Sequence, residues 1–389
     1  MAEARFSAGL LGFLRLVFPS FISSCGLGGM RPSAAIRRLV ASISGNDLAM
    51  ASVPFLKFDS GDLRLTACTA FAHADINIPH LTTSGLRPIS KAFRSNIAQL
   101  RFMMLLPAHI GDLAMMMQHL ADLAEHQTTG VLSNSIPSDK KDAYETCWMK
   151  LFRAELDRRA YERVQPEWHD KALIKLKNST APAEMLGTLP PPMPLGLSAM
   201  LSSYLTSTWT AFETMCGDLW EAAVNTSPER LAHLKGERRR LMKGSQSRFQ
   251  AEQPETKSVP LNLLQSHRFD VKDKMGTILR ESRFEFSRIQ DIREAYALAF
   301  DRDSAKIDEV LTDKTIDALH IVRNVIVHQA GLADERYMKA KGNLKLPNAA
   351  LGAPLLLDGE IVVNMISPVI DRSKKLLDAV DGWLIKHRT

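Results

Sequence analysis

Residues 198–224, SAMLSSYLTSTWTAFETMCGDLWEAAV, decide the fold class of this chain. Core-type side chains return in this stretch every three or four residues, which is the period of an α-helix with a buried face. These positions are Met200, Leu201, Tyr204, Leu205, Thr208, Phe212, Met215, Leu219 and Trp220. The pair Ser227-Pro228 ends the pattern, because the residue before a proline disfavours helical backbone. We therefore expect a long helix here and a mainly α-helical fold.

The rest of the C-terminal half repeats this helical pattern. We expect helices over 269–286, 287–300, 307–329 and 367–386. The run LLLDGEIVV at 355–363 places Asp-Gly between short apolar segments, which is typical of a β-hairpin. Residues 198–389 are thus expected to form a helical bundle with a small β-hairpin appendage.

The chain of 389 residues is long enough for two domains, and a proline-rich stretch indicates where they divide. Residues 179–197 include Leu-Pro-Pro-Pro-Met-Pro at 189–194, which favours extended backbone and is interpreted as a linker. Residues 50–178 are expected to form an α-rich domain with a minor β element, a hairpin near 55–66. Helical spacing in that domain covers 89–106, 110–126 and 139–164. Its role stays open.

The net charge of +6 is weak support for a polyanionic partner, because part of it lies in the first 46 residues, where five arginines face one glutamate. Residues 1–49 are interpreted as a basic, acid-poor extension. It is either a targeting peptide or a non-native extension that precedes a start at Met30 or Met50, and we favour the second interpretation. The segment 6–22 is too short and too interrupted to predict a membrane span, so no membrane partner is expected. The scattered Cys25, Cys68, Cys147 and Cys216 fit a reducing, cytoplasmic location.

A second basic segment lies within the C-terminal half. Residues 229–259 are polar and are interpreted as an exposed insertion with partial helix. Its cluster of Arg238, Arg239, Arg240 and Lys243 is a weak candidate for RNA binding. A solvated surface is the favoured interpretation, because Phe249 is the one aromatic residue near the cluster.

The helix expected over 307–329 carries the residues that point to chemistry. Successive helical residues are about 100° apart, so His320, Arg323, Asn324 and His328 fall within an arc of roughly 140°. A histidine can exchange protons near neutral pH, and a guanidinium can stabilise the extra charge of a phosphorane, which suits phosphodiester cleavage. Spacing alone favours a structural role instead, because cations are also stabilised at a helix C-terminus.

A family resemblance shifts that balance. The run RNVIVHQAGLADERY at 323–337 resembles the signature of the HEPN superfamily, found in prokaryotic toxin and abortive-infection proteins. The family pattern is an arginine, four to six residues and a histidine, often with a polar residue after the arginine, as Asn324 is here. The resemblance extends to FEFSRIQDIREAY at 284–296 and WTAFE at 209–213 and covers about residues 198–389.

The resemblance implies a bundle of four to five helices and a homodimeric, metal-independent endoribonuclease that uses no cofactor. It assigns catalysis to Arg323 and His328, with Asn324 and His320 as supporting neighbours. An acidic residue that orients the arginine is also implied, and Glu213 and Asp218 both qualify by position. RNA is the expected substrate in toxin or antiviral-defence activity, and an antitoxin or regulatory protein is an expected partner. The alternative is a non-catalytic HEPN scaffold that binds a nucleotide or a protein.

Other enzyme classes find no support in the sequence. We find no metal-ligand spacing, phosphate-binding glycine loop, nucleophile elbow or paired catalytic carboxylates. The prediction of function therefore depends on the run from Arg323 to His328.

Overall fold

The computed structural model of the protein describes residues 66–132, 136–165, 167, 193–236 and 259–388, all within one compact unit, residues 59–389. These residues are mainly helical, which confirms the predicted fold class, and the β pairing described among them is an isolated bridge between Leu332 and Pro354. The hairpin expected near 55–66 lies almost wholly outside the described residues. The elements are α4 (Thr66–His73), η1 (Ser84–Leu86), α5 (Arg87–Thr129), η2 (Ser138–Lys140), α6 (Lys141–Arg163), α9 (Met193–Thr226), α10 (Pro228–Leu231), α11 (Leu261–Ser266), α12 (Met275–Arg283), α13 (Ile289–Ala299), α14 (Ala305–Leu311), α15 (Lys314–His328), α16 (Glu335–Lys341) and α17 (Gly359–Lys386).

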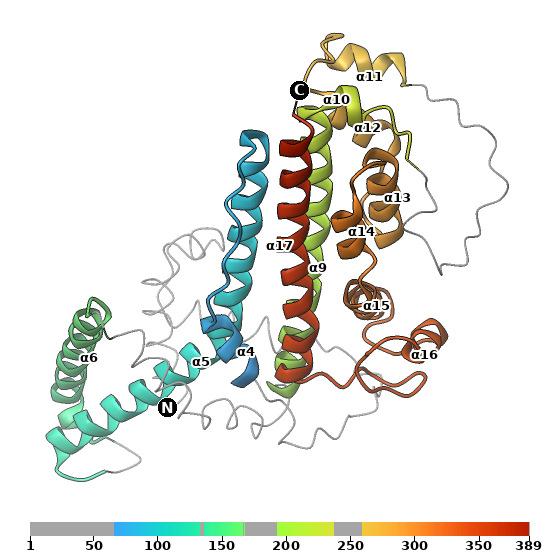
Figure 1. The fold of residues 1–389 in the computed structure, drawn as a ribbon. Coiled ribbons are helices and arrows are strands. Elements are labelled where there is room, and N and C mark those ends of the chain that lie inside the picture. Colours follow the sequence, from blue (N-terminus) through green and yellow to red (C-terminus); the bar gives the residue numbers. More distant parts are fainter. Residues whose placement is uncertain (1–65, 133–135, 166, 168–192, 237–258, 389) are drawn as a thin grey trace. The chain divides into compact units, whose positions relative to one another are not determined.

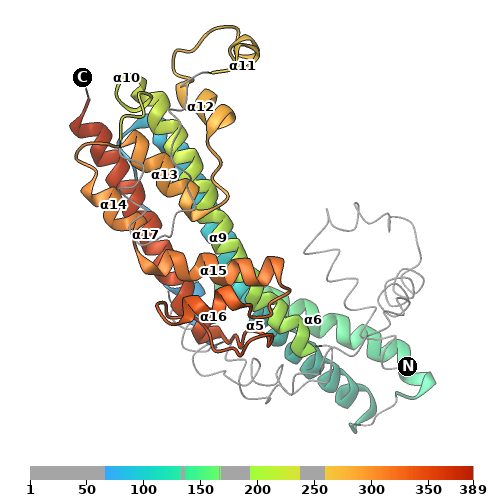
Figure 2. The same cartoon turned by 90° about the vertical axis from the view of Figure 1, so that its right-hand side faces the viewer.

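Helix α9 is the central element of this unit. It spans 34 residues, and α5, α12, α13, α15 and α17 all pack against it. Helix α17 lies alongside α9 with the C-terminal ends of both at the same end of the bundle, whereas α15 crosses the pair (Figures 1 and 2). A helix enclosed in this way needs apolar residues on more than one face. The buried side chains of α9 include Leu201, Tyr204, Leu205, Trp209, Phe212, Met215, Leu219, Trp220 and Val224.

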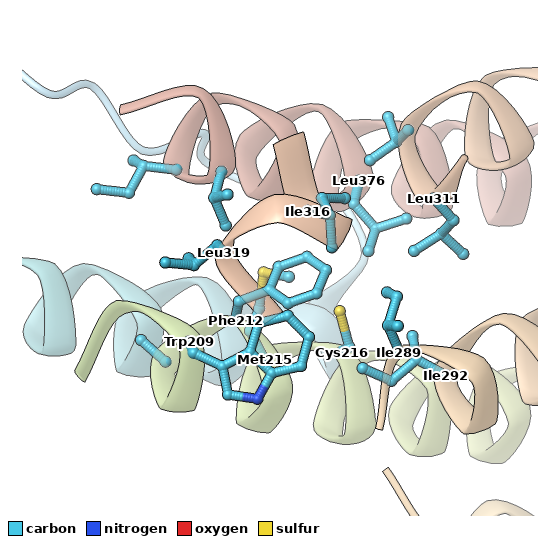
Figure 3. Close-up of a cluster of buried hydrophobic side chains, with 14 of the residues drawn as sticks. Trp209, Phe212, Met215, Cys216, Ile289, Ile292, Leu311, Ile316, Leu319 and Leu376 are labelled. Carbon is cyan, nitrogen blue, oxygen red and sulfur yellow. The ribbon is translucent and has the colours of Figure 1, made fainter. Parts of the chain in front are cut away.

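Side chains from five helices meet in the core beside α9 (Figure 3). Trp209, Phe212, Met215 and Cys216 come from α9. Neighbouring helices add Ile289, Ile292, Leu311, Ile316, Leu319 and Leu376.

Two buried hydrogen bonds fix α13 against α9. Trp220 Nε1 donates to the Ala295 carbonyl at 2.9 Å, and the Tyr296 hydroxyl donates to the Cys216 carbonyl at 2.9 Å. Buried polar atoms without partners are costly, so these bonds specify the register of the two helices as well as their contact. Burial also raises the pKa of the Tyr296 hydroxyl and of the Cys216 thiol well above their ordinary values.

The helices before and after the expected linker share one core. Helices α4 and α5 pack on α17 and α9, and Phe93, Leu100 and Met104 join the same buried cluster as Leu205. The expected linker at 179–197 lies mostly outside the described residues, although α9 already begins at Met193. The packing therefore joins the N-terminal helices to the C-terminal bundle.

Helix α5 continues through Pro107, where the sequence predicts a break between two helices. Proline has no N–H, so the carbonyl four residues earlier, that of Met103, loses its helical donor. The Tyr204 hydroxyl of α9 donates to this carbonyl at 3.0 Å. A tertiary hydrogen bond thus replaces the missing helical one, and burial raises the pKa of Tyr204.

Two further predictions about the C-terminal half need correction. The helix expected over 307–329 is divided into α14 and α15, because Asp313 caps α15 by accepting from Thr315 N at 2.8 Å. The hairpin expected over 355–363 does not form, since Asp358 accepts from Ile361 N at 2.7 Å and starts α17 at Gly359. In both cases an aspartate at a helix start outweighs the local pattern.

Helix α6 packs on the distal part of α5. The 23 residues of α6 include no fully buried side chain among those described, and Met149, Leu156 and Tyr161 are exposed. A groove of about 520 Å³ separates the two helices, lined by Met116, Leu120, Leu151 and Arg159 among others. This pair of helices extends the bundle without adding to its main core.

Asp381 of α17 anchors the start of the N-terminal helices, and we expect its removal to destabilise the protein. Its carboxylate accepts from Thr82 N at 2.7 Å and from Thr83 N at 2.9 Å. Asp381→Ala leaves both donors without this partner, so the free energy of unfolding should fall by about 1–3 kcal/mol in urea titrations. Asp371→Ala, which removes an exposed ion pair with Lys374, is the control and should change it by about 0.5 kcal/mol or less. Equal losses in the two variants would contradict the anchoring role.

Candidate functional site

Arg323 and His328 lie in the last turns of α15. One side of this helix is buried against α9 and α17 through Ile316, Leu319 and Val322. The other side faces solvent, where Arg323 is half-buried and His328 is exposed. The fold therefore presents the end of α15 as a polar surface above the core.

A chain of polar contacts joins the four residues that the helical arc groups together. Arg323 Nη1 donates to Asn324 Oδ1 at 3.1 Å and lies 3.3 Å from His328 Nε2. Asn324 Nδ2 lies 3.1 Å from His320 Nε2. Arginine and the amide nitrogen of asparagine only donate, so in each of these contacts the histidine Nε2 atom can take part in a hydrogen bond as the acceptor. Asn324 thus links the exposed end of the chain to its buried end.

His320 is the buried end of this chain. Its side chain is 8% exposed, and its ring lies against the Trp209 indole at 4.7 Å between centroids. Burial first, and then the nearby Arg323 and Arg293 guanidinium groups, lower the pKa of His320 to about 4. The ring is therefore neutral at physiological pH and serves as a fixed hydrogen-bond partner for Asn324.

Glu213 approaches the same site from α9, one helical turn beyond Trp209. Its carboxyl is half-buried, and burial raises its pKa, while the Trp209 indole N–H and the Arg323 guanidinium act in the opposite direction. The buried Trp209 Nε1 has no hydrogen bond of ordinary geometry in the described part of the chain. Glu213 is thus the acidic residue of α9 that interacts electrostatically with Arg323.

Asp218 belongs to a different cluster. Arg280 Nη1 of α12 donates to Asp218 Oδ1 and to Glu221 Oε2, both at 2.8 Å. Thr277 Oγ1 also donates to Glu221 at 2.6 Å. These contacts attach α12 to α9, so the structure brings Glu213, and not Asp218, to the α15 site.

Two ion pairs lie beside the site, and their residues were not identified as candidates from the sequence. Arg293 of α13 pairs with Asp317 of α15 at 2.9 Å, and Arg288 pairs with Asp291 at 2.8 Å. Arg288, Asp291 and Arg293 all influence the pKa of His320. All three lie in the stretch 284–296 that carries the family resemblance, which was the available signal. The α13 side of the site thus offers cations already neutralised by carboxylates.

Other predicted features lie outside this site. Arg238, Arg239, Arg240 and Lys243 fall outside the described residues. Across the described part of the chain, no three His, Cys, Asp or Glu side chains are grouped as a metal site requires. No described helix is both long enough and apolar enough to cross a membrane.

The depressed pKa of His320 predicts a specific pH dependence of stability. As pH falls below about 6.5, the unfolded chain binds a proton at this position that the folded chain binds only near pH 4. The free energy of unfolding should therefore lose about 2 kcal/mol between pH 7 and pH 5 through this residue. Urea titrations at both values should show that loss in the wild type and in His119→Gln, an exposed control, and not in His320→Phe. Identical pH dependence in His320→Phe and the wild type would show that His320 does not carry it.

Comparisons with family models, with curated proteins and with solved structures give no match. Two observations therefore bear on function. One is the geometry at the end of α15, and the other is the resemblance to the HEPN superfamily in residues 209–213, 284–296 and 323–337.

Proposed function

We propose that this chain is a HEPN-type, metal-independent endoribonuclease that acts in the cytoplasm as a toxin or antiphage-defence effector. One observation supports the proposal most directly: the guanidinium of Arg323 lies 3.3 Å from Nε2 of His328 at the C-terminal end of α15. A permanent cation and a titratable base are thus adjacent on a surface that a polynucleotide can reach.

The proposed reaction is intramolecular transesterification of RNA. His328 Nε2, acting as general base beside Arg323, takes the proton of a ribose 2′-hydroxyl. The 2′-oxygen forms a bond to phosphorus, the bond from phosphorus to the 5′-oxygen breaks, and Arg323 stabilises the negative charge of the phosphorane. The 5′-oxygen leaves with a proton from solvent or from the histidine of a second protomer. The products are a 2′,3′-cyclic phosphate and a 5′-hydroxyl.

The surroundings of Arg323 support a positioned catalytic group rather than a mobile surface arginine. Asn324 accepts its N–H, His320 holds Asn324, and Trp209 packs against His320. His320 and Trp209 are buried, so their rotamers are fixed by the core. A catalytic side chain that is positioned by buried residues in this way loses little conformational entropy when substrate binds.

Exposed apolar side chains near the site support the proposed homodimer. Val327 is 49% exposed beside His328, and Leu332, Leu351 and Leu356 are 44%, 61% and 52% exposed in the loops that follow. Apolar groups gathered near a polar site are typical of a surface that a second subunit covers. A dimer formed there would bring two copies of α15 together, as the HEPN resemblance implies.

Loss of either proposed catalytic residue should abolish RNA cleavage. We expect Arg323→Ala and His328→Ala to reduce the cleavage rate of single-stranded and structured RNA in EDTA by roughly 10²–10⁴-fold. Electrophoresis of labelled RNA measures the rate, and end-group analysis should find 2′,3′-cyclic phosphates. Arg302→Ala and His119→Ala, exposed residues outside the site, are the matched controls and should cleave as the wild type does. Equal RNA loss in all of these proteins would instead favour the non-catalytic scaffold.

Glu213 and Asp218 should respond differently to removal of their charge. Glu213→Gln takes the carboxylate away from Arg323, so we expect slower cleavage, on the order of tenfold or more, with little change in the thermal midpoint. Asp218→Asn weakens the Arg280 cluster, so we expect a lower thermal midpoint and near-normal cleavage at a temperature where the variant is folded. The opposite assignment of the two effects would show that Asp218 is the residue that orients the arginine.

A further inference from the structure

Helix α16 carries basic side chains and packs against α15, the helix that ends at His328. Six residues, 329–334, separate the end of α15 from the start of α16, and the two helices pack against each other. The connection folds back onto α15, since Gly331 N donates to the Val325 carbonyl at 3.0 Å. Figure 2 shows α16 lying alongside α15.

The solvent-facing side of α16 is positively charged. Arg336 and Lys339 are exposed one turn apart, and Lys345 is exposed in the loop that follows. None of these three has an ion-pair partner among the described residues. Residues 323–349 contain five basic and two acidic side chains, a net charge of +3 in a chain whose total is +6. One of those acids, Asp334, is engaged as the helix cap, where it accepts from Tyr337 N at 2.8 Å.

This basic face, formed by Arg336, Lys339 and Lys345, lies on a rigid support. Tyr337 is fully buried beneath it and donates to the Pro347 carbonyl at 2.6 Å. Two backbone hydrogen bonds hold the loops around it. Ala333 N donates to the Ala353 carbonyl at 2.8 Å, and Gly352 N donates to the Ala333 carbonyl at 2.8 Å. The cations therefore project from a fixed platform, which lowers the entropic cost of binding.

The charges around the α15 site are unequal on its two sides. Toward α9 and α13, Arg293 and Arg288 are paired with Asp317 and Asp291, and Glu213 adds a further carboxylate. Toward α16, Arg336, Lys339 and Lys345 have no ion-pair partner within the part of the chain that the structure describes. A polyanion at His328 therefore gains little attraction on the first side, where the charges are paired, and is attracted on the second.

We propose that the basic face of α16 binds the phosphate backbone of the RNA as it passes the Arg323 and His328 site. This inference rests on the proposed ribonuclease function and names where its substrate lies. The described residues of this face include no exposed aromatic side chain on which a base could stack, so we expect its cations to contact phosphates, a contact that does not depend on base sequence.

The test is the salt dependence of RNA binding. A fluorescently labelled oligouridylate of about 20 nucleotides is titrated with the full chain carrying His328→Ala, so that binding is measured without cleavage. The same protein with Arg336→Gln, Lys339→Gln and Lys345→Gln should bind more weakly at low salt. Its slope of log affinity against log salt should be smaller by about 2, since each lost phosphate contact on a single strand contributes about 0.7.

A charge-matched control separates this effect from a loss of net charge. Arg302→Gln, Lys306→Gln and Arg388→Gln remove three exposed cations at the other end of the bundle, where Trp383 Nε1 near the end of α17 donates to the Arg302 carbonyl. This control should keep the salt slope of the His328→Ala parent. Equal slopes in the control and in the α16 variant would overturn the inference, as would an affinity of the α16 variant equal to that of the His328→Ala parent.

The outcomes also separate this inference from the proposed function. RNA binding that depends on α16, in a wild type that does not cleave, keeps the inference and removes the catalytic proposal. Cleavage that the three α16 substitutions leave unchanged, with unchanged binding, keeps the catalytic proposal and overturns the inference. Binding of polyglutamate through the same three residues, with no binding of RNA, would assign the face to an acidic protein and overturn the inference as well.

Discussion

The enclosure of α9 is the constraint on which the rest of the described structure depends. Its side chains are buried against helices from both ends of the sequence, so α4 and α5 cannot be separated from the C-terminal bundle without exposing apolar surface. Each large apolar side chain contributes on the order of 1.5–3 kcal/mol to the stability of the fold when it is fully buried. The arrangement of the surrounding helices follows from the shape and hydrogen bonds of this one helix.

The candidate site is an extension of that core. Trp209 is a core residue of α9, yet its indole is also the surface on which His320 lies, and Glu213 stands one turn further along the same helix. The contacts run from the buried Trp209 through the neutral His320 and Asn324 to the half-buried Arg323, so the rigid core restricts the motion of the arginine. A change in the packing of α9 against α15 would therefore move Arg323 and His328 as well as destabilise the fold.

Much of the fold could be predicted from the sequence, because helical periodicity is a local property. The long helix expected over 198–224 is observed over Met193–Thr226, and the face that groups His320, Arg323, Asn324 and His328 follows from helix geometry. The errors arise where one side chain outweighs the pattern. Asp313 divides a continuous periodic stretch, and Asp358 turns an apparent Asp-Gly hairpin into a helix start. The choice between Glu213 and Asp218 depends on which helix packs beside each carboxylate, and one-dimensional spacing holds no such information.

The bond between Tyr204 and Met103 has a consequence for how the sequence can change. Pro107 creates the carbonyl that lacks a helical donor, and Tyr204, remote in sequence, supplies the replacement. Phenylalanine at 204 is tolerable once another residue stands at 107 to restore the helical bond, and proline at 107 is tolerable while a hydroxyl reaches the Met103 carbonyl. The two positions are thus energetically coupled, and we expect related sequences to change them together, with the order of the two replacements deciding which evolutionary paths keep a stable bundle.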